Sequence, residues 1–297
     1  MTSPALTELI AQLRALRSPE ADARTLDPLG VRANLDLFAT NRAIGLDVRE
    51  IDILRDLAPE DPGYDDESAV FLPAEWLLPT GADPDVRLVY LHGGGYVAGS
   101  PRTHRGLITR IAKAAGCVAL APDYRLAPEH LFPAALDDAR LALAYAHDHG
   151  PEGASPAKRV LLAGDSAGGG LALATLLAAR DSGERLPARA ATMSAWTDLA
   201  TTGASLESRA EADPMIPAWV LRGWSKHYLG DQDPRDPRAS PLYGDLRGLP
   251  PLHLQVGDLE ILLDDTVRFA ERALAASVEA ELVVYPELFH VLSLIHI

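Results

Sequence analysis

The chain has 297 residues, a formal net charge of −15 at pH 7 and a single cysteine. This length suffices for one large α/β domain with an insertion, and the single cysteine, Cys117, excludes a disulfide framework. The negative charge argues against nucleic acid and other polyanionic partners, and no apolar run approaches the roughly 18 residues that a membrane-spanning segment requires.

The first 45 residues are expected to form helices outside the main sheet. Leucine and isoleucine recur at helical spacing from Leu6 to Leu16, behind a Ser3-Pro4 helix start. No basic segment followed by a continuous apolar run precedes them, so the pattern indicates an amphipathic helix rather than a secretion signal, and we predict a cytoplasmic protein. Residues 1–45 are therefore assigned to N-terminal cap helices.

A buried strand is predicted over Val86–Leu91, and it leads directly into the sequence HGGGY at residues 92–96. Consecutive glycines let backbone N–H groups turn toward a bound molecule. Attack on an ester carbonyl creates an oxyanion that needs such donors already in place. Gly93, Gly94 and Gly95 are therefore candidate oxyanion-hole residues, with Gly94 and one flanking glycine as the expected donors. A glycine-rich turn without chemistry and a phosphate-binding loop are the alternatives, but the second lacks both Gly-Lys-Ser/Thr and the G-x-G-x-x-G spacing.

Strand and helix patterns alternate through the next part of the chain. The predicted elements are a helix over Thr103–Ala115, a strand over Cys117–Ala121, a helix over Ala134–Asp148 and a strand over Arg159–Ala163. Such alternation is typical of a mostly parallel sheet with helices on both faces.

The last of these strands runs into GDSAG at residues 164–168 and then into a helical stretch, Leu171–Arg180. A strand, a sharp turn with a serine at its apex and a helix form a nucleophile elbow, whose strained turn lifts the hydroxyl clear of its neighbours. The flanking strand and helix make the match more specific than the five-residue pattern alone, which also fits a plain Gly/Ser turn. Ser166 is the candidate nucleophile, and the N–H of Ala167 is a further candidate oxyanion donor. Asp165 is expected to be structural, because adjacent elbow residues point away from each other.

Together these two motifs resemble the bacterial hormone-sensitive-lipase family of α/β-hydrolase esterases. A further stretch of that family lies between them, reading DYRLAPEH at residues 123–130 and FPAALDD at residues 132–138. The similarity covers nearly the whole chain. It implies an α/β-hydrolase fold with a helical cap over the active site, serine carboxylesterase activity on small, mostly short-acyl esters, and no cofactor or metal. In such an enzyme His92 would hold the oxyanion loop through hydrogen bonds.

Residues 200–229 fall outside the alternation and are assigned to a cap insertion, which follows a predicted strand over Ala190–Trp196. Large apolar side chains recur in it at helix-like spacing, for which ordinary core packing is the simple explanation. In an α/β-hydrolase, however, an insertion at this point lies over the carboxyl edge of the sheet. The candidate substrate-pocket residues are therefore Met215, Trp219 and Trp224 of the insertion, with Tyr96 of the glycine-rich segment.

A serine nucleophile needs a histidine base and a carboxylate that orients the base. After the next predicted strand, the sequence GDLEILLDD at residues 257–265 offers four carboxylates. Alignment of the family pattern D-P-L-x-D-E places Glu260 at its first aspartate, so Glu260 is the preferred triad acid and Asp258 the alternative. Asp264 and Asp265 are expected to begin the following helix, because acidic side chains suit a first turn.

His290 is the candidate base. It follows the last strand-like run, Glu281–Tyr285, and comes after the serine and the acid in the chain order typical of this fold. Only Val291–Ile297 follows it, whereas the resemblance implies another full helix. We therefore expect a C-terminal helix to be missing from this sequence, and we assign residues 46–199 and 230–297 to the catalytic domain.

These patterns predict a serine carboxylesterase that acts on a small-molecule ester of short to medium acyl length. A homodimer is compatible with the sequence. A lactone, amide or carbamate hydrolase would use the same residues. A ligand-binding protein similar to the plant hormone receptors of this family is the alternative from another class, but those receptors lack the catalytic histidine, and His290 argues against it. A lipase acting at oil–water interfaces is disfavoured by the lack of an extended apolar surface segment.

Overall fold

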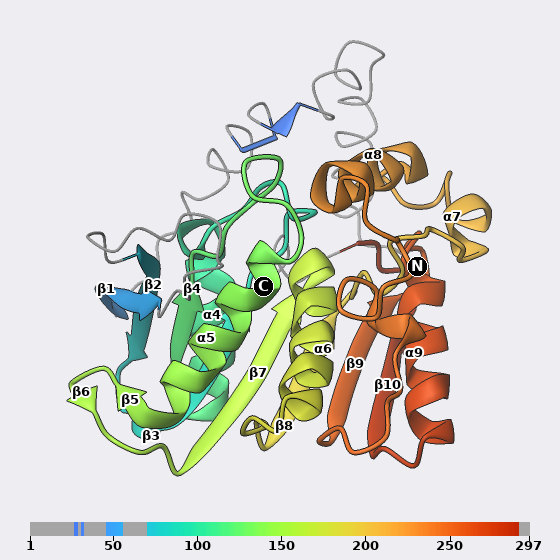
Figure 1. Ribbon diagram of the computed structural model, residues 1–297. Helices are drawn as coiled ribbons and strands as arrows, with labels where there is room; N and C mark the ends of the chain where they lie inside the picture. The colour runs from blue at the N-terminus through green and yellow to red at the C-terminus, as the bar shows by residue number, and fades with distance from the viewer. Residues whose placement is uncertain (1–26, 29–30, 33–45, 56–69, 291–297) are drawn as a thin grey trace, which may run out of the picture.

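Eight strands form the central sheet, in the order β1-β2-β4-β3-β7-β8-β9-β10 (Figure 1). The computed structural model describes residues 27–28, 31–32, 46–55 and 70–290. The strands are β1 (Leu46–Arg55), β2 (Val70–Pro79), β3 (Asp83–Leu91), β4 (Cys117–Pro122), β7 (Arg159–Asp165), β8 (Arg189–Met193), β9 (Leu252–Gly257) and β10 (Ala280–Tyr285), with a separate small sheet of β5 (His149–Gly150) and β6 (Gly153–Ala154). β2 runs antiparallel to both of its neighbours, and the other neighbouring pairs of the large sheet are parallel. The predicted mostly parallel sheet is confirmed.

Helices cover both faces of this sheet because alternate side chains of a strand point to opposite sides. The covering helices are α4 (Pro101–Ala115), α5 (Ala134–Asp148), α6 (Ser166–Asp181) and α9 (Leu263–Ala275). On β3, Leu88 and Tyr90 pack with residues of α4, whereas Val89 and Leu91 belong to the larger core formed with α5, α6 and α9. Figure 1 shows the last three helices in front of the sheet. The buried second half of β3 and the whole of β4, which are apolar in sequence, thus lie between two helical layers.

The segment assigned to the cap contains two helices. A single turn, α7 (Ser205–Ser208), is followed after Pro217 by α8 (Ala218–Leu229). Both lie beyond the carboxyl ends of the parallel strands, beside the point where α6 begins (Figure 1). A short 3-10 helix, η1 (Pro241–Tyr243), lies on the return to the main domain.

The strands and helices predicted after residue 85 are present to within a few residues of the expected bounds. The strands β1 and β2 lacked a specific prediction. Most of the predicted N-terminal cap helices, and the segment Val291–Ile297, lie outside the described residues. Within the described part of the chain, no helix has the length and apolar character needed to cross a membrane.

Candidate active site

Ser166 stands at the turn between β7 and α6, as predicted. Its φ of +53° lies in the left-handed region, which is strained for a residue with a side chain and is characteristic of a nucleophile elbow. The turn closes so tightly that a Cβ on Gly164 would lie 2.4 Å from the carbonyl oxygen of Gly168, and one on Gly168 would lie 2.1 Å from that of Leu91. Glycine is therefore required at both flanking positions.

A hydrogen-bonded chain connects Ser166 to a histidine and a glutamate. Nε2 of His290 lies 2.9 Å from the Ser166 Oγ, and its Nδ1 lies 3.0 Å from Oε2 of Glu260. A carboxylate only accepts hydrogen bonds, so Nδ1–H donates to Glu260 and Nε2 is left to accept from the serine hydroxyl. All three side chains are buried. The arrangement has the geometry of a Ser-His-acid triad.

Asp258, the alternative acid, has a different partner. Its Oδ1 accepts the backbone N–H of Glu287 at 2.7 Å, and its own N–H donates to the carbonyl oxygen of Tyr285. These bonds tie the loop after β9 to the loop after β10. The structure thus brings Glu260, and not Asp258, to His290.

The second carboxylate oxygen of Glu260 is also occupied. Oε1 accepts the N–H of Gly257 at 2.6 Å and the hydroxyl of Ser194 at 2.7 Å. Ser194 directly follows β8 and has a φ of +53°. Ser194 is not among the residues predicted from the sequence, although a serine at the carboxyl end of a strand adjacent to that of the nucleophile is a detectable signal. With His290, three donors fix the orientation of this carboxylate.

The environment of His290 favours its protonated form. Burial alone lowers the pKa of this imidazole, but the hydrogen bond to Glu260 raises it, as do the negative charges of Glu260 and two further buried carboxylates. The net result is a pKa above the ordinary 6.5. The further carboxylates are Asp213 and Asp165. A raised pKa makes His290 a stronger base toward Ser166 once it is neutral.

The glycine-rich loop after β3 packs against the turn that carries Ser166, since a Cβ on Gly168 would lie 2.3 Å from the carbonyl oxygen of His92. Gly94 and Gly95 have φ values of +125° and +65°, and a Cβ on Gly94 would lie 2.1 Å from the carbonyl oxygen of Ala98. Within the described residues, no acceptor takes the N–H of Gly94, Gly95 or Ala167. These three amides stay the candidate oxyanion donors.

Gly93 does not match that prediction. Its N–H already donates to Oδ1 of Asp165 at 3.1 Å and lies 3.3 Å from Nε2 of His104. A Cβ on Gly93 would lie 2.3 Å from the other carboxylate oxygen of Asp165, so glycine serves here for close packing. The expectation that Gly93 is an oxyanion donor is therefore wrong, and the expectation that Asp165 is structural is confirmed.

Buried side chains hold the glycine-rich loop after β3 in place. The Tyr124 hydroxyl donates to the carbonyl oxygen of His92 at 2.6 Å, and the Tyr90 hydroxyl donates to Asp165 at 2.8 Å. The ring of His92 stacks on that of Tyr124, and its Nδ1–H donates to the carbonyl oxygen of Gly93. Burial lowers the pKa of His92 to about 3, which keeps this ring neutral. His92 thus holds the loop through a hydrogen bond, as predicted.

The four predicted pocket residues occupy different environments. Trp224 of α8 lies against Gly95, where an added Cβ would be 2.2 Å from its ring. Tyr96 is buried in the core, with its ring stacked on that of Tyr228, so it supports the site from within. Met215 and Trp219 are half-buried on the cap. Trp224 is thus the cap residue of this set that contacts the oxyanion loop.

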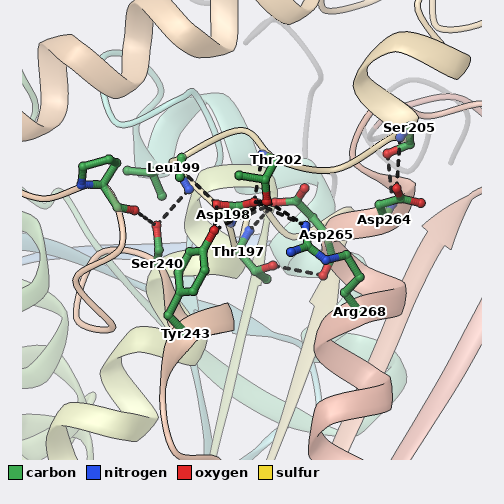
Figure 2. Close-up of polar contacts among 12 residues, drawn as sticks. Thr197, Asp198, Leu199, Thr202, Ser205, Ser240, Tyr243, Asp264, Asp265 and Arg268 are labelled. Carbon is green, nitrogen blue, oxygen red and sulfur yellow. Dashed lines mark hydrogen bonds and ion pairs between the residues drawn. The ribbon is translucent and has the colours of Figure 1, made fainter.

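Asp264 and Asp265 lie in the first turn of α9, as predicted. The Asp264 side chain reaches Ser205 of the cap insertion, and the Asp265 side chain reaches the residues just before the insertion. Oδ2 of Asp265 accepts the N–H groups of Thr197 and Asp198, both at 2.9 Å, and Arg268 lies 3.3 Å from Asp198 (Figure 2). Burial, and then the charge of Asp198, raise the pKa of Asp265 well above its ordinary value. This network anchors the entrance of the insertion to α9. No cluster of His, Cys, Asp and Glu suited to a metal ion occurs among the described residues.

Comparisons with known proteins agree with this geometry. Residues 88–294 match a family model described as the alpha/beta hydrolase fold. An acetyl-hydrolase of Streptomyces hygroscopicus is 46% identical over 218 residues, which cover 73% of this chain and 71% of the relative. A carboxylic ester hydrolase of Mycobacterium tuberculosis is 32% identical, over 91% of this chain and 77% of the relative.

A crystal structure of an esterase from the bacterial hormone-sensitive lipase family is similar over 98% of this chain and 91% of that chain, with a TM-score of 0.81 and 39% sequence identity. The resemblance inferred from the motifs is confirmed. The chain belongs to the α/β-hydrolase family, among the esterases of the bacterial hormone-sensitive-lipase type, and is a carboxylic ester hydrolase.

Proposed function

We propose that this carboxylesterase uses Ser166 as its nucleophile and acts on small esters of short to medium acyl length through an acyl-enzyme. The observation that supports this most directly is the chain of hydrogen bonds from Ser166 through His290 to Glu260, at 2.9 and 3.0 Å. A serine hydroxyl is a weak nucleophile at its own pKa, and this chain supplies the base and the group that orients it.

In the first half of the reaction, His290 takes the proton of Ser166 while Oγ attacks the ester carbonyl carbon. The carbonyl oxygen becomes an oxyanion near the N–H groups of Gly94, Gly95 and Ala167. The tetrahedral intermediate collapses, the bond to the alcohol oxygen breaks, and His290 gives its proton to that oxygen. Glu260 accepts from Nδ1 throughout and stabilises the imidazolium.

In the second half, water replaces the alcohol. His290 takes a proton from the water as it attacks the acyl carbon, a second oxyanion forms, and collapse breaks the bond to Oγ. The proton returns to Ser166, and the carboxylic acid leaves. No redox cofactor is needed, because no electrons leave the substrate.

A small acyl group is favoured by two observations. Trp224 lies against Gly95, so a large indole ring bounds the region next to the proposed donors. The relative from Streptomyces hygroscopicus is named an acetyl-hydrolase. A cytoplasmic location, the absence of macromolecular partners and a homodimer stay predictions from the sequence.

The test is hydrolysis of p-nitrophenyl acetate, butyrate, octanoate and palmitate, with rapid mixing to detect a burst of nitrophenol. We expect turnover of the first three, little of palmitate, and a loss of roughly 10⁴ to 10⁶ in kcat for Ser166→Ala. A matching set of lactones, anilides and carbamates separates the hydrolases that share these residues. Full activity in folded Ser166→Ala would refute the mechanism, and a preference for palmitate would refute the substrate class.

A further inference from the structure

The cap insertion and the loop that carries Glu260 meet at one residue, Ile261. Ile261 directly follows Glu260, and cap side chains take both of its backbone polar groups. Its N–H donates to Oδ2 of Asp213 at 3.0 Å, and its carbonyl oxygen accepts from the Ser205 hydroxyl at 2.7 Å. We call Asp213 and Ser205 the Ile261 clamp.

Both clamp residues are themselves fixed within the cap. Ser205 is 2% exposed, donates its N–H to Asp264 at 3.0 Å and receives the N–H of Asp264 on its hydroxyl (Figure 2). Asp213 is fully buried between α7 and α8, and its Oδ1 accepts the N–H of Met215 at 2.9 Å. The same carboxylate therefore orders the cap segment of Met215 and the peptide next to the triad acid.

We propose that the Ile261 clamp positions Glu260, so that the cap insertion sets the geometry of the acid–histidine pair, with Asp213 as the principal positioning residue. This inference rests on the proposed serine mechanism. The Glu260–Ile261 peptide unit donates its N–H to Asp213, and its carbonyl oxygen, that of Glu260, accepts the N–H of Leu263 at 3.2 Å. The next peptide unit accepts from Ser205 on the Ile261 carbonyl oxygen, so neither unit can rotate without breaking a hydrogen bond. Because the Glu260 side chain reaches Gly257, Ser194 and His290 from the adjoining residue, a shift of Ile261 would misalign these contacts.

Asp213 also acts on the site through its charge. The buried acidic groups that raise the pKa of His290 come from three elements: Glu260 from the loop after β9, Asp165 from the end of β7 and Asp213 from the cap. Burial raises the pKa of Asp213 itself, and the nearby His290 opposes that shift. A carboxylate that only stabilised the fold would leave the pKa of His290 unchanged. The pH profile therefore distinguishes a purely structural role of Asp213 from a role in the active site.

The test compares Asp213→Asn with Ser205→Ala and with a control, Asp138→Asn. Asp138 is another buried carboxylate, paired with Arg125 at 3.0 Å and absent from the contacts of the triad. For p-nitrophenyl butyrate we expect Asp213→Asn to lower kcat on the order of tenfold by misalignment. We also expect it to move the acid limb of kcat/KM down by about half a pH unit or more. Ser205→Ala should lower kcat several-fold with the acid limb unmoved, because no charge is lost.

The acid limb of Asp138→Asn should equal that of wild type. Folded Asp213→Asn with the wild-type kcat and acid limb would overturn the proposal, as would an equal shift in Asp138→Asn. If circular dichroism shows that Asp213→Asn does not fold, Ser205→Ala decides: reduced kcat supports the clamp, and wild-type kcat overturns it. Ser166→Ala, assayed in parallel, tests the serine mechanism separately.

Discussion

Two loops flank Ser166 on either side of β7, and they are held in place by different means. The oxyanion loop after β3 depends on backbone conformation: Gly94 and Gly95 adopt positive φ, and the loop packs without room for a Cβ. The acid loop after β9 depends on side chains: Glu260 is fixed by three donors, and its neighbour Ile261 by the cap. An amide donor has no side chain to adjust, so its position must be set by the backbone.

The same difference explains why glutamate can stand where the family pattern has aspartate. Glutamate is one methylene longer than aspartate, but it can still orient His290 because hydrogen bonds hold both of its carboxylate oxygens in place. The oxyanion loop allows no comparable substitution, since an added methyl group at Gly94 meets the backbone of Ala98.

Of the variants in the two loops, the one with the largest expected loss of kcat lies in the acid loop. Glu260→Gln should lower kcat by roughly 10³ to 10⁴, because a neutral amide neither holds Nδ1–H of His290 in the right tautomer nor stabilises the imidazolium. Asp258→Asn is the matched control: asparagine keeps an oxygen to accept the N–H of Glu287, so kcat should stay within about twofold of wild type. Steady-state kinetics with p-nitrophenyl acetate measures both, and the reverse ranking would exchange the two assignments.

The next largest expected loss of kcat results from a change in the oxyanion loop. Gly94→Ala should lower kcat by about 10² to 10³, because the added Cβ forces the loop to move and displaces a donor. Gly183→Ala is the control, since Gly183 also has a positive φ, +70°, but has open space around it. Its strain should appear as a lower melting temperature with kcat unchanged. Equal kcat for the two folded variants would show that the loop is not fixed as described.

The pH dependence of kcat/KM tests how the buried carboxylates act on His290. Because the pKa of His290 is raised above 6.5, kcat/KM should fall as pH decreases through a midpoint above 6.5, by about tenfold per pH unit once the base is protonated. The measurement is a profile from pH 5 to 9 with a substrate that does not titrate. A midpoint below 6.5 would mean that burial outweighs the charges of Glu260, Asp213 and Asp165.

The smallest expected effect concerns the support beneath the oxyanion loop. Tyr124→Phe removes the donor to the buried His92 carbonyl, which should cost about 1 to 3 kcal/mol of unfolding free energy. For a domain of this size that corresponds to a melting temperature lower by about 2 to 4 °C per kcal/mol, with kcat reduced only a few-fold. Tyr285→Phe, at an exposed tyrosine on β10, is the control and should melt with wild type. An unchanged melting temperature for Tyr124→Phe would show that this bond contributes little.

Much of the fold and the site could be predicted from local patterns. The strand over Val86–Leu91, the turn at Ser166 and the run before His290 are each identified by neighbouring residues, because apolar periodicity and turn residues are local properties. The pairing of Glu260 with His290 was also anticipated, through the family pattern. What local patterns could not predict is the partner of each polar group: Asp165 takes the Gly93 amide from 72 positions away.

The sequence by itself determined the class of chemistry, the serine and histidine, and the alternation of strands and helices, because these follow from residue type and spacing along the chain. Tertiary structure showed that Glu260, the preferred acid, contacts His290 and that Asp258 does not, and that the Gly93 N–H already has an acceptor. It also identified Ser194, Asp213 and Ser205 as supporting residues. The physical reason is that a buried polar group bonds to whatever partner the packed sheet brings within about 3 Å, and the ends of adjacent parallel strands bring together residues that lie far apart in sequence.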